Sequence, residues 1–140
     1  MLRKEDVIRL LKQLPFDESE YWVASGAALV LCGVREETRD IDPGCTSAPD
    51  ERLVREGYAE NRFPDGSRRI IYSDEIEIFE NRIEGETVMT EGFPAVSLDG
   101  IIRMKEKLGR EKDQKDIALI KEFMKKSRPW QGTVCSGRQS

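Results

Sequence analysis

The sequence predicts an α+β fold in which helices flank one mixed β-sheet. Apolar residues recur with helical spacing near both ends of the chain, whereas several segments in the middle alternate polar and apolar residues as half-buried strands do. The 140 residues are 36% charged and 38% hydrophobic, which is typical of a globular protein with a polar surface. This length suits one domain that is large enough to bury a core.

The first half of the chain contains three helix-like and two strand-like segments. We expect a helix over 4–14, a strand over 21–24, a helix over 26–32, a strand over 40–45 and a helix over 49–56. The first helix has an apolar stripe formed by Val7, Leu10, Leu11 and Leu14. Pro15 ends that helix, and Gly33 and Gly57 occupy positions where helices commonly stop. Ser47 is a suitable N-cap for the third helix.

The second half begins with strands and ends with helices. We expect hairpin strands over 58–63 and 68–72, a strand over 75–79, short edge elements at 87–89 and 95–96, and helices over 99–108 and 112–124. The tetrapeptide Pro64-Asp65-Gly66-Ser67 is a strong turn signal between the hairpin strands. Residues 1–126 are therefore expected to form a single domain. Residues 127–140 lose periodicity and are expected to be a flexible tail.

Two short motifs indicate chemistry. Asp40 and Asp42 stand at positions i and i+2, which point to the same face of a strand. Neighbouring carboxylates repel each other unless a cation lies between them, and Mg²⁺ prefers such oxygen ligands. The Ser25-Gly26 turn leads into a helix, whose first N–H groups can bind phosphate. Either motif alone is commonly structural, but their order and spacing together favour a metal and phosphate site.

These motifs resemble the nucleotidyltransferase fold of the DNA polymerase beta type, in its minimal single-domain bacterial form. That family has a Gly-Gly or Gly-Ser turn, a helix, and then an h-D-h-D strand in which h is apolar. Ser25-Gly26 and Asp40-Ile41-Asp42 correspond to these parts. The family's R-x-T-x-D-I-D approach is matched by Arg35 and residues 38–42 with slightly different spacing, and its K-x-x-L-G-R-x-K-D-x-x-D-I segment corresponds to residues 105–117. The resemblance covers residues 20–125.

The resemblance implies a nucleotidyltransferase-like mixed sheet and a site for Mg²⁺ and a nucleoside triphosphate. Such sites commonly hold two ions roughly 3.5–4 Å apart, and three carboxylates typically bind them. Asp40 and Asp42 would supply two of the three. Glu77, which lies between Ile76 and Ile78, is the best third candidate, and Glu75 on the same face is the next. Alternating acids also form the solvated side of many strands, so Glu77 has a purely structural alternative.

The resemblance also assigns the residues that would bind the nucleotide. These are Ser25, Gly26, Lys105, Arg110 and Lys112. For the last three the alternative is that charged residues only stabilise and solvate the helices around them. Three features depart from the family pattern or weaken a candidate. Ser25 replaces a glycine, Pro43 removes an N–H group and would end strand pairing after the dyad, and Arg39 on a strand would face away from both aspartates.

Composition excludes several other kinds of site. The chain has no histidine, so histidine acid–base catalysis and histidine-ligated zinc are excluded, and its three cysteines lack the spacing of a metal site. No apolar run is long enough to span a membrane, and the N-terminus is not a signal peptide, so we expect a cytoplasmic protein. Residues 36–98 carry 16 acids and 7 bases, and residues 99–126 carry 9 bases and 6 acids. This asymmetry fits a metal site that faces a phosphate-attracting surface.

The leading hypothesis is a Mg²⁺-dependent enzyme that transfers a nucleoside monophosphate from a triphosphate to a hydroxyl acceptor. The acceptor would be a small molecule, an RNA or a protein. Small relatives of the fold include antibiotic-modifying enzymes and the toxin halves of toxin–antitoxin or phage-defence pairs. One alternative is a non-catalytic nucleotide-binding module, and another is a protein-interaction domain whose D-x-D is only structural. A domain of this size has little room for an acceptor site, so a protein partner or a homodimer is expected to complete one.

Overall fold

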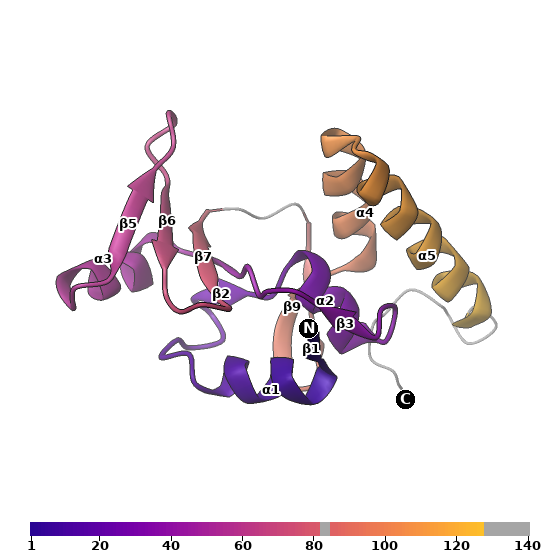
Figure 1. Ribbon diagram of the computed structural model, residues 1–140, viewed down its shortest axis with the longest axis horizontal. Helices are drawn as coiled ribbons and strands as arrows, with labels where there is room; N and C mark the ends of the chain where they lie inside the picture. The colour runs from indigo at the N-terminus through magenta and orange to yellow at the C-terminus, as the bar shows by residue number, and fades with distance from the viewer. Residues whose placement is uncertain (82–84, 128–140) are drawn as a thin grey trace.

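The computed structural model describes residues 1–81 and 85–127 and has the α+β architecture that the sequence predicts. Its helices are α1 (Lys4–Lys12), α2 (Ser25–Cys32), α3 (Ser47–Arg55), α4 (Leu98–Leu108) and α5 (Glu111–Ser127). Its strands are β1 (Leu2–Arg3), β2 (Tyr21–Trp22), β3 (Glu37–Thr38), β4 (Gly44–Cys45), β5 (Ala59–Arg62), β6 (Arg68–Ile71), β7 (Glu77–Glu80), β8 (Thr87–Thr90) and β9 (Phe93–Val96). Figure 1 shows α3 and the β5–β6 hairpin at one end of the molecule and the paired helices α4 and α5 at the other.

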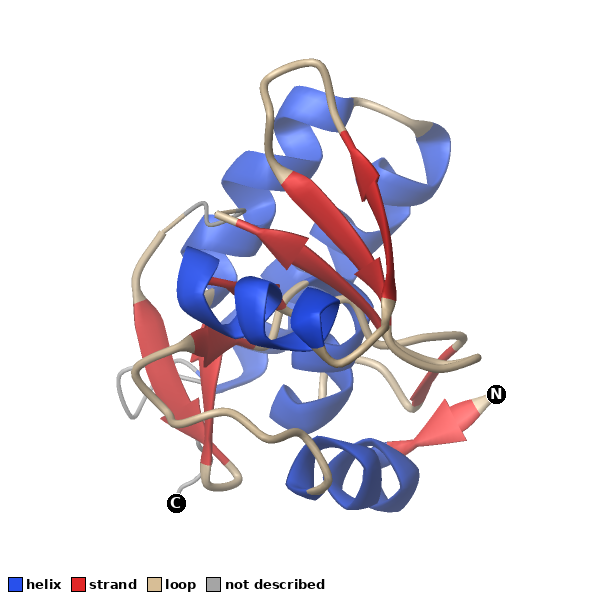
Figure 2. Cartoon of the chain, turned by 90° about the vertical axis from the view of Figure 1, so that its left-hand side faces the viewer, coloured by secondary structure: helices blue, strands red, loops and turns tan. Residues whose placement is uncertain are grey.

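The central element is a five-stranded mixed sheet in the order β2-β4-β7-β6-β5. Figure 2 shows the strands in red with helices around them. Strands β4 and β7 are parallel, and the other neighbours are antiparallel. Strand β9 lies beside the end of β2, because the Val23 N–H donates to the Pro94 carbonyl at 2.7 Å and the Val96 N–H donates to the Val23 carbonyl at 2.9 Å. The β8–β9 hairpin therefore extends the sheet towards α4, which begins two residues after β9.

Helix α2 is buried on all sides, which explains why its sequence is an uninterrupted apolar run. Residues 27–32 are all buried. Gly33 ends the helix with a φ of +91°, a conformation that glycine adopts without steric cost. The N–H groups of Val34 and Arg35 then both donate to the Leu29 carbonyl, at 2.9 and 3.3 Å. This reversal sends β3 back along α2 towards the start of that helix.

Most predicted elements are present with small changes in their bounds. The hairpin has the predicted turn, and its register pairs Arg62 with Arg68. The structure adds the short pair β1–β3, which two-residue strands do not reveal by periodicity. The expected flexible tail begins at Ser127, which is the last residue of α5, and the rest of it lies outside the described residues. No helix in residues 1–81 and 85–127 has both the length and the apolar character that crossing a membrane requires.

The strand expected over 40–45 is regular only at its end. Gly44–Cys45 forms β4, and Ile41 makes an isolated parallel bridge to Ile76. Pro43 lies between them and has no N–H group, but its carbonyl accepts a hydrogen bond from the Phe79 N–H at 2.9 Å. The prediction that pairing ends at Pro43 was therefore wrong, because pairing with β7 continues directly after it.

A buried polar cluster joins α3 to the face of the sheet opposite the dyad. The Arg68 guanidinium donates to both carboxylate oxygens of Glu80, at 3.1 and 2.8 Å, and its Nε lies 3.9 Å from Oδ2 of Asp50. The Cys45 thiol donates to Oδ1 of Asp50 at 3.1 Å. Hydrogen bonds from Arg68 hold the pKa of Glu80 down to about 2, whereas burial raises the pKa of Asp50 to about 6.

We expect ionisation of the buried Asp50 carboxyl to lower the free energy of unfolding as pH rises. Its folded-state pKa lies above that of an unfolded chain, so protonation stabilises the fold below about pH 4, and this contribution is lost as pH rises through 6. Between about pH 4.5 and 8 the free energy of unfolding of the wild type is expected to fall by on the order of 2 kcal/mol relative to that of Asp50→Asn, which cannot ionise at this position. Urea unfolding of both proteins at the two pH values measures this difference. Equal pH dependence in both would contradict it.

Candidate functional site

Seven of the eight predicted site residues line one cleft between the sheet and the α4–α5 pair. These residues are Ser25, Gly26, Asp40, Asp42, Lys105, Arg110 and Lys112. The cleft has a volume of about 720 Å³, which is within the range of small-molecule sites. It therefore brings together predicted site residues that lie up to 87 residues apart in the sequence.

The two aspartates are positioned by the residue between them. Ile41 is fully buried, its N–H donates to the Glu75 carbonyl at 2.8 Å, and its carbonyl accepts from the Glu77 N–H at 3.1 Å. Because side chains alternate along an extended backbone, Asp40 and Asp42 emerge on the face opposite Ile41 and both line the cleft. The dyad is thus fixed by two backbone hydrogen bonds to the parallel neighbour.

The Ser25-Gly26 turn is a strained and tightly packed start to α2. Ser25 has a φ of +54°, which is uncommon for a residue other than glycine. A side chain at Gly26 would lie 2.5 Å from Oγ1 of Thr38, so only glycine fits without displacing the Thr38 side chain. Strain of this kind, which costs on the order of 1 kcal/mol, often marks a functional turn.

Gly26→Ala is expected to disturb the turn, and Thr38→Ala should relieve the disturbance. The new methyl group would collide with a threonine that is 4% exposed, and overpacking of this kind costs about 1–3 kcal/mol. Removing the Thr38 hydroxyl in the double variant removes the colliding atom. Thermal unfolding of the two single variants and the double variant measures this coupling. Additive effects in the double variant would contradict the predicted collision.

Two of the predicted phosphate-binding cations are already engaged by carboxylates. The Lys105 amine is 3.0 Å from Oδ2 of Asp116 and 3.5 Å from Oδ1 of Asp113, and its side chain is only 6% exposed. Nε of Arg110 donates to Oδ2 of Asp113 at 2.6 Å, and this contact lowers the pKa of the Asp113 carboxyl. Lys105 and Arg110 therefore line the cleft as members of an ion-pair network.

The cleft is also lined by cations that were not among the site residues predicted from the sequence. Arg39 lines the cleft beside the dyad, so the expectation that it faces away was wrong, because Arg39 stands in a bend that precedes the extended segment 40–42. Lys115 and Arg35 line it as well. Within the described residues, Arg39, Lys112 and Lys115 are exposed and make no ion pair. These side chains make the cleft attractive to a polyanion.

Glu77 lies beside the dyad on the neighbouring strand but does not line the cleft. The Ile41–Ile76 bridge places Asp42 next to Glu77 on the face opposite the two isoleucines. The Glu77 carboxylate lies 3.6 Å from Nη1 of Arg69, and Glu77 is absent from the residues around the cleft. Its role as the third metal ligand remains a prediction.

The residues in the cleft fit one Mg²⁺ ion better than two. Proteins often hold Mg²⁺ through one or two carboxylates together with substrate phosphates, which Asp40 and Asp42 are placed to do. No group of three acidic, histidine or cysteine side chains in residues 1–81 and 85–127 is arranged to hold a metal. A second ion would need a further carboxylate to move.

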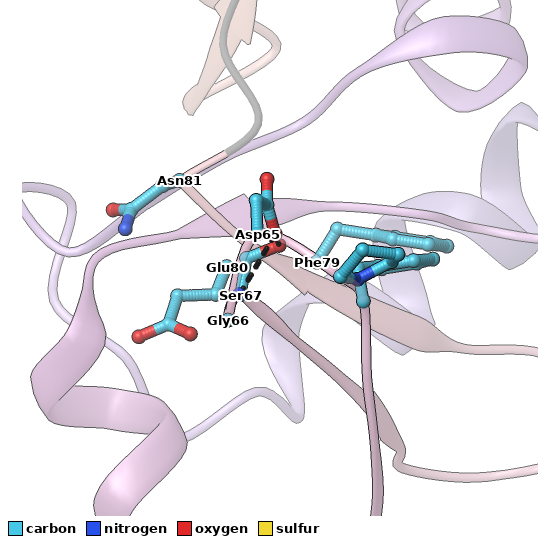
Figure 3. A pocket seen from close by; sticks show the side chains of 8 residues that line it. Asp65, Gly66, Ser67, Phe79, Glu80 and Asn81 are labelled. Atoms are coloured by element: carbon cyan, nitrogen blue, oxygen red, sulfur yellow. Dashed lines mark hydrogen bonds between the residues drawn. The ribbon is translucent and has the colours of Figure 1, made fainter.

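A second hollow of about 730 Å³ lies at the turn of the β5–β6 hairpin, beside the end of β7, and includes none of the predicted site residues (Figure 3). Its acids are engaged: Asp65 accepts hydrogen bonds from the Ser67 N–H and hydroxyl at 2.9 and 2.7 Å, and Glu80 is paired with Arg68. The rings of Phe63 and Phe79 stack with centroids 6.3 Å apart. The predicted aspartate pair and the exposed cations Arg39, Lys112 and Lys115 line the cleft described above instead.

Comparison with solved structures supports this reading of the fold. The crystal structure of the lincosamide antibiotic adenylyltransferase LnuA, with lincomycin bound, matches with a TM-score of 0.60 and 12% sequence identity. The match covers 84% of this chain and 95% of that chain. No protein-family profile and no curated protein sequence matches the chain. The predicted nucleotidyltransferase-like α+β fold is therefore confirmed by the structural likeness.

Proposed function

We propose that the protein is a nucleotidyltransferase that moves a nucleoside monophosphate from a nucleoside triphosphate to a hydroxyl acceptor. The observation that carries the proposal is the composition of one cleft. It combines two side-by-side carboxylates, a strained small-residue turn at a helix N-terminus, and exposed cations. The fold shared with an adenylyltransferase agrees with it.

In this reaction the acceptor hydroxyl attacks the α-phosphorus, the bond to the β-phosphate oxygen breaks, and pyrophosphate leaves. The acceptor proton passes to a base or to water. A bound Mg²⁺ ion would neutralise phosphate charge, and Asp40 and Asp42 would hold it. The Ser25-Gly26 turn would hold the leaving phosphates through N–H groups, and Arg39, Lys112 and Lys115 would attract the triphosphate.

The first test is calorimetric titration of the wild type with ATP and with GTP, with and without Mg²⁺. Binding that requires Mg²⁺ supports the proposal and justifies a search for the acceptor. That search would use α-labelled triphosphate with pools of small hydroxyl compounds, RNA and protein, and would follow release of pyrophosphate. Absence of binding at millimolar nucleotide would contradict the proposal.

The position of Glu77 favours a second candidate, a nucleotide-binding module without turnover. Glu77 is paired with Arg69 outside the cleft, and the described residues contain no three-carboxylate group. Such a module would bind the Mg²⁺–nucleotide complex and release no pyrophosphate with any acceptor pool. Turnover separates the two candidates, and a homodimer or protein partner that completes the site would appear as activity that depends on concentration or on the added partner.

A further inference from the structure

We propose that Asp116 is a positioning residue that holds Arg35 beside the Ser25-Gly26 turn, and that Arg35 is the guanidinium that receives the triphosphate there. The inference rests on the proposed function, since it assigns a role within the same cleft. It gives Asp116 a task beyond stabilising the first turns of α5, and it adds Arg35 to the residues that contact the ligand.

The contact between Asp116 and Arg35 joins two distant parts of the chain. Nη1 of Arg35 lies 3.6 Å from Oδ2 of Asp116, and the same oxygen lies 3.0 Å from the Lys105 amine. Asp116 therefore bridges the segment after α2 to both α4 and α5. Its side chain is 14% exposed, so this bridge is partly shielded from solvent and is stronger than a fully exposed ion pair.

Lys105 already supplies a counter-charge for Asp116, because Arg110 pairs with the neighbouring Asp113. The Lys105 amine is buried between Asp113 and Asp116 and contacts both. The additional contact with Arg35 therefore serves placement more than neutralisation. In the absence of Asp116, the long Arg35 side chain would have many rotamers, and ordering it on ligand binding would cost free energy.

The guanidinium of Arg35 lies against the turn that is expected to hold phosphate. Nη1 is 3.4 Å from the position that a side chain on Gly26 would occupy, and both residues line the cleft. The Arg35 backbone is also fixed, because its N–H donates to the Leu29 carbonyl at the end of α2. Within the described part of the chain, Asp116 is the only ion-pair partner of Arg35. The other guanidinium donors can therefore form the two parallel hydrogen bonds that arginine makes to phosphate.

The proposal makes a prediction whose sign differs from simple electrostatics. Asp116→Asn removes a negative charge from the cleft, which by Coulomb attraction alone would strengthen binding of an anion. If Asp116 positions Arg35, the same variant binds inorganic tripolyphosphate and Mg²⁺–ATP about tenfold more weakly, which is the expected loss of one charge-assisted hydrogen bond. The matched control is Glu111→Gln, which removes the same charge from an exposed residue of α5 outside the cleft.

Calorimetric titration tests this with five proteins: the wild type, Asp116→Asn, Glu111→Gln, Arg35→Gln and the Asp116→Asn/Arg35→Gln double variant. Thermal unfolding shows that each protein is folded. The double variant is expected to bind no more weakly than Arg35→Gln, because Asp116 acts through Arg35. Arg35→Lys is expected to restore little of the affinity, because lysine keeps the charge but not the paired donors. Unchanged or tighter binding by Asp116→Asn, or an undiminished effect of it in the Arg35→Gln background, would overturn the proposal.

A second measurement keeps the two proposals distinguishable. If the wild type binds neither ATP nor tripolyphosphate, the proposed function fails, and the ligand assigned to Arg35 fails with it. Amide hydrogen exchange over residues 33–39 still tests the structural part. Exchange there is expected to be faster in Asp116→Asn than in Glu111→Gln, and equal exchange would overturn the positioning role.

Discussion

The Mg²⁺ dependence of nucleotide binding is expected to disappear when Asp40 and Asp42 are both replaced by asparagine. The two carboxylates emerge side by side into the cleft, and their charge supplies the attraction for a divalent cation. Without them, Mg²⁺ bound to the triphosphate gains nothing from the protein. The wild type is expected to bind Mg²⁺–ATP about 100-fold more tightly than the double variant, which corresponds to about 2.8 kcal/mol of binding free energy.

Calorimetric titration with ATP in Mg²⁺ and in excess chelator measures both the affinity and its metal dependence. Glu36→Gln is the matched control, because Glu36 is an exposed acid four residues before Asp40 that does not line the cleft. Asparagine preserves the size of each side chain, so the fold should persist, and thermal unfolding checks that it does. A double variant that still requires Mg²⁺ for binding would place the metal away from the dyad.

Replacing Arg68 with methionine is expected to destabilise the fold by about 3–5 kcal/mol. Arg68 is 7% exposed and is the cation that faces both Glu80 and Asp50. Its removal leaves two carboxylates buried against each other without a counter-charge. For a domain of this size the expected fall in the midpoint of thermal unfolding is on the order of 10–15 °C.

The neighbouring residue supplies the control for this prediction. Arg69 is on the same strand but points to the opposite face, where its pair with Glu77 is 35% and 41% exposed. Arg69→Met is therefore expected to cost no more than about 1 kcal/mol. Combining Arg68→Met with Glu80→Gln should recover part of the lost stability, because one of the stranded charges is removed. Equal destabilisation by Arg68→Met and Arg69→Met would show that the cluster contributes little.

The elements that were predicted correctly from the sequence are those defined by residues close together in the chain. The apolar stripe of α1, the Pro64-Asp65-Gly66-Ser67 turn and the glycines after α2 and α3 each act within a few residues. They identify helices and turns because helical spacing, positive φ and the missing N–H of proline are properties of short segments. The short strands β1 and β3 have no such signal, since each is defined only by its partner.

Part of the predicted site also depends on sequence signals that lie within short segments. The dyad and the Ser25-Gly26 turn follow from residue type and spacing, and the structure places them in one cleft. The ion-pair partners of the charged residues could not be predicted from residue type and spacing. Arg35 contacts Asp116 from 81 residues away, and Arg68 contacts Asp50 and Glu80 from two other elements.

By itself the sequence determined an α+β chain with a carboxylate pair and a small-residue turn that suit metal and phosphate. The tertiary structure decided which cations face the cleft, that Lys105 and Arg110 are engaged by Asp113 and Asp116, and that Glu77 is paired with Arg69. The physical reason is the separation along the sequence over which each kind of interaction acts. Backbone conformation responds to neighbours a few residues away, whereas an ion pair forms between whichever opposite charges the packed core brings within about 4 Å of each other.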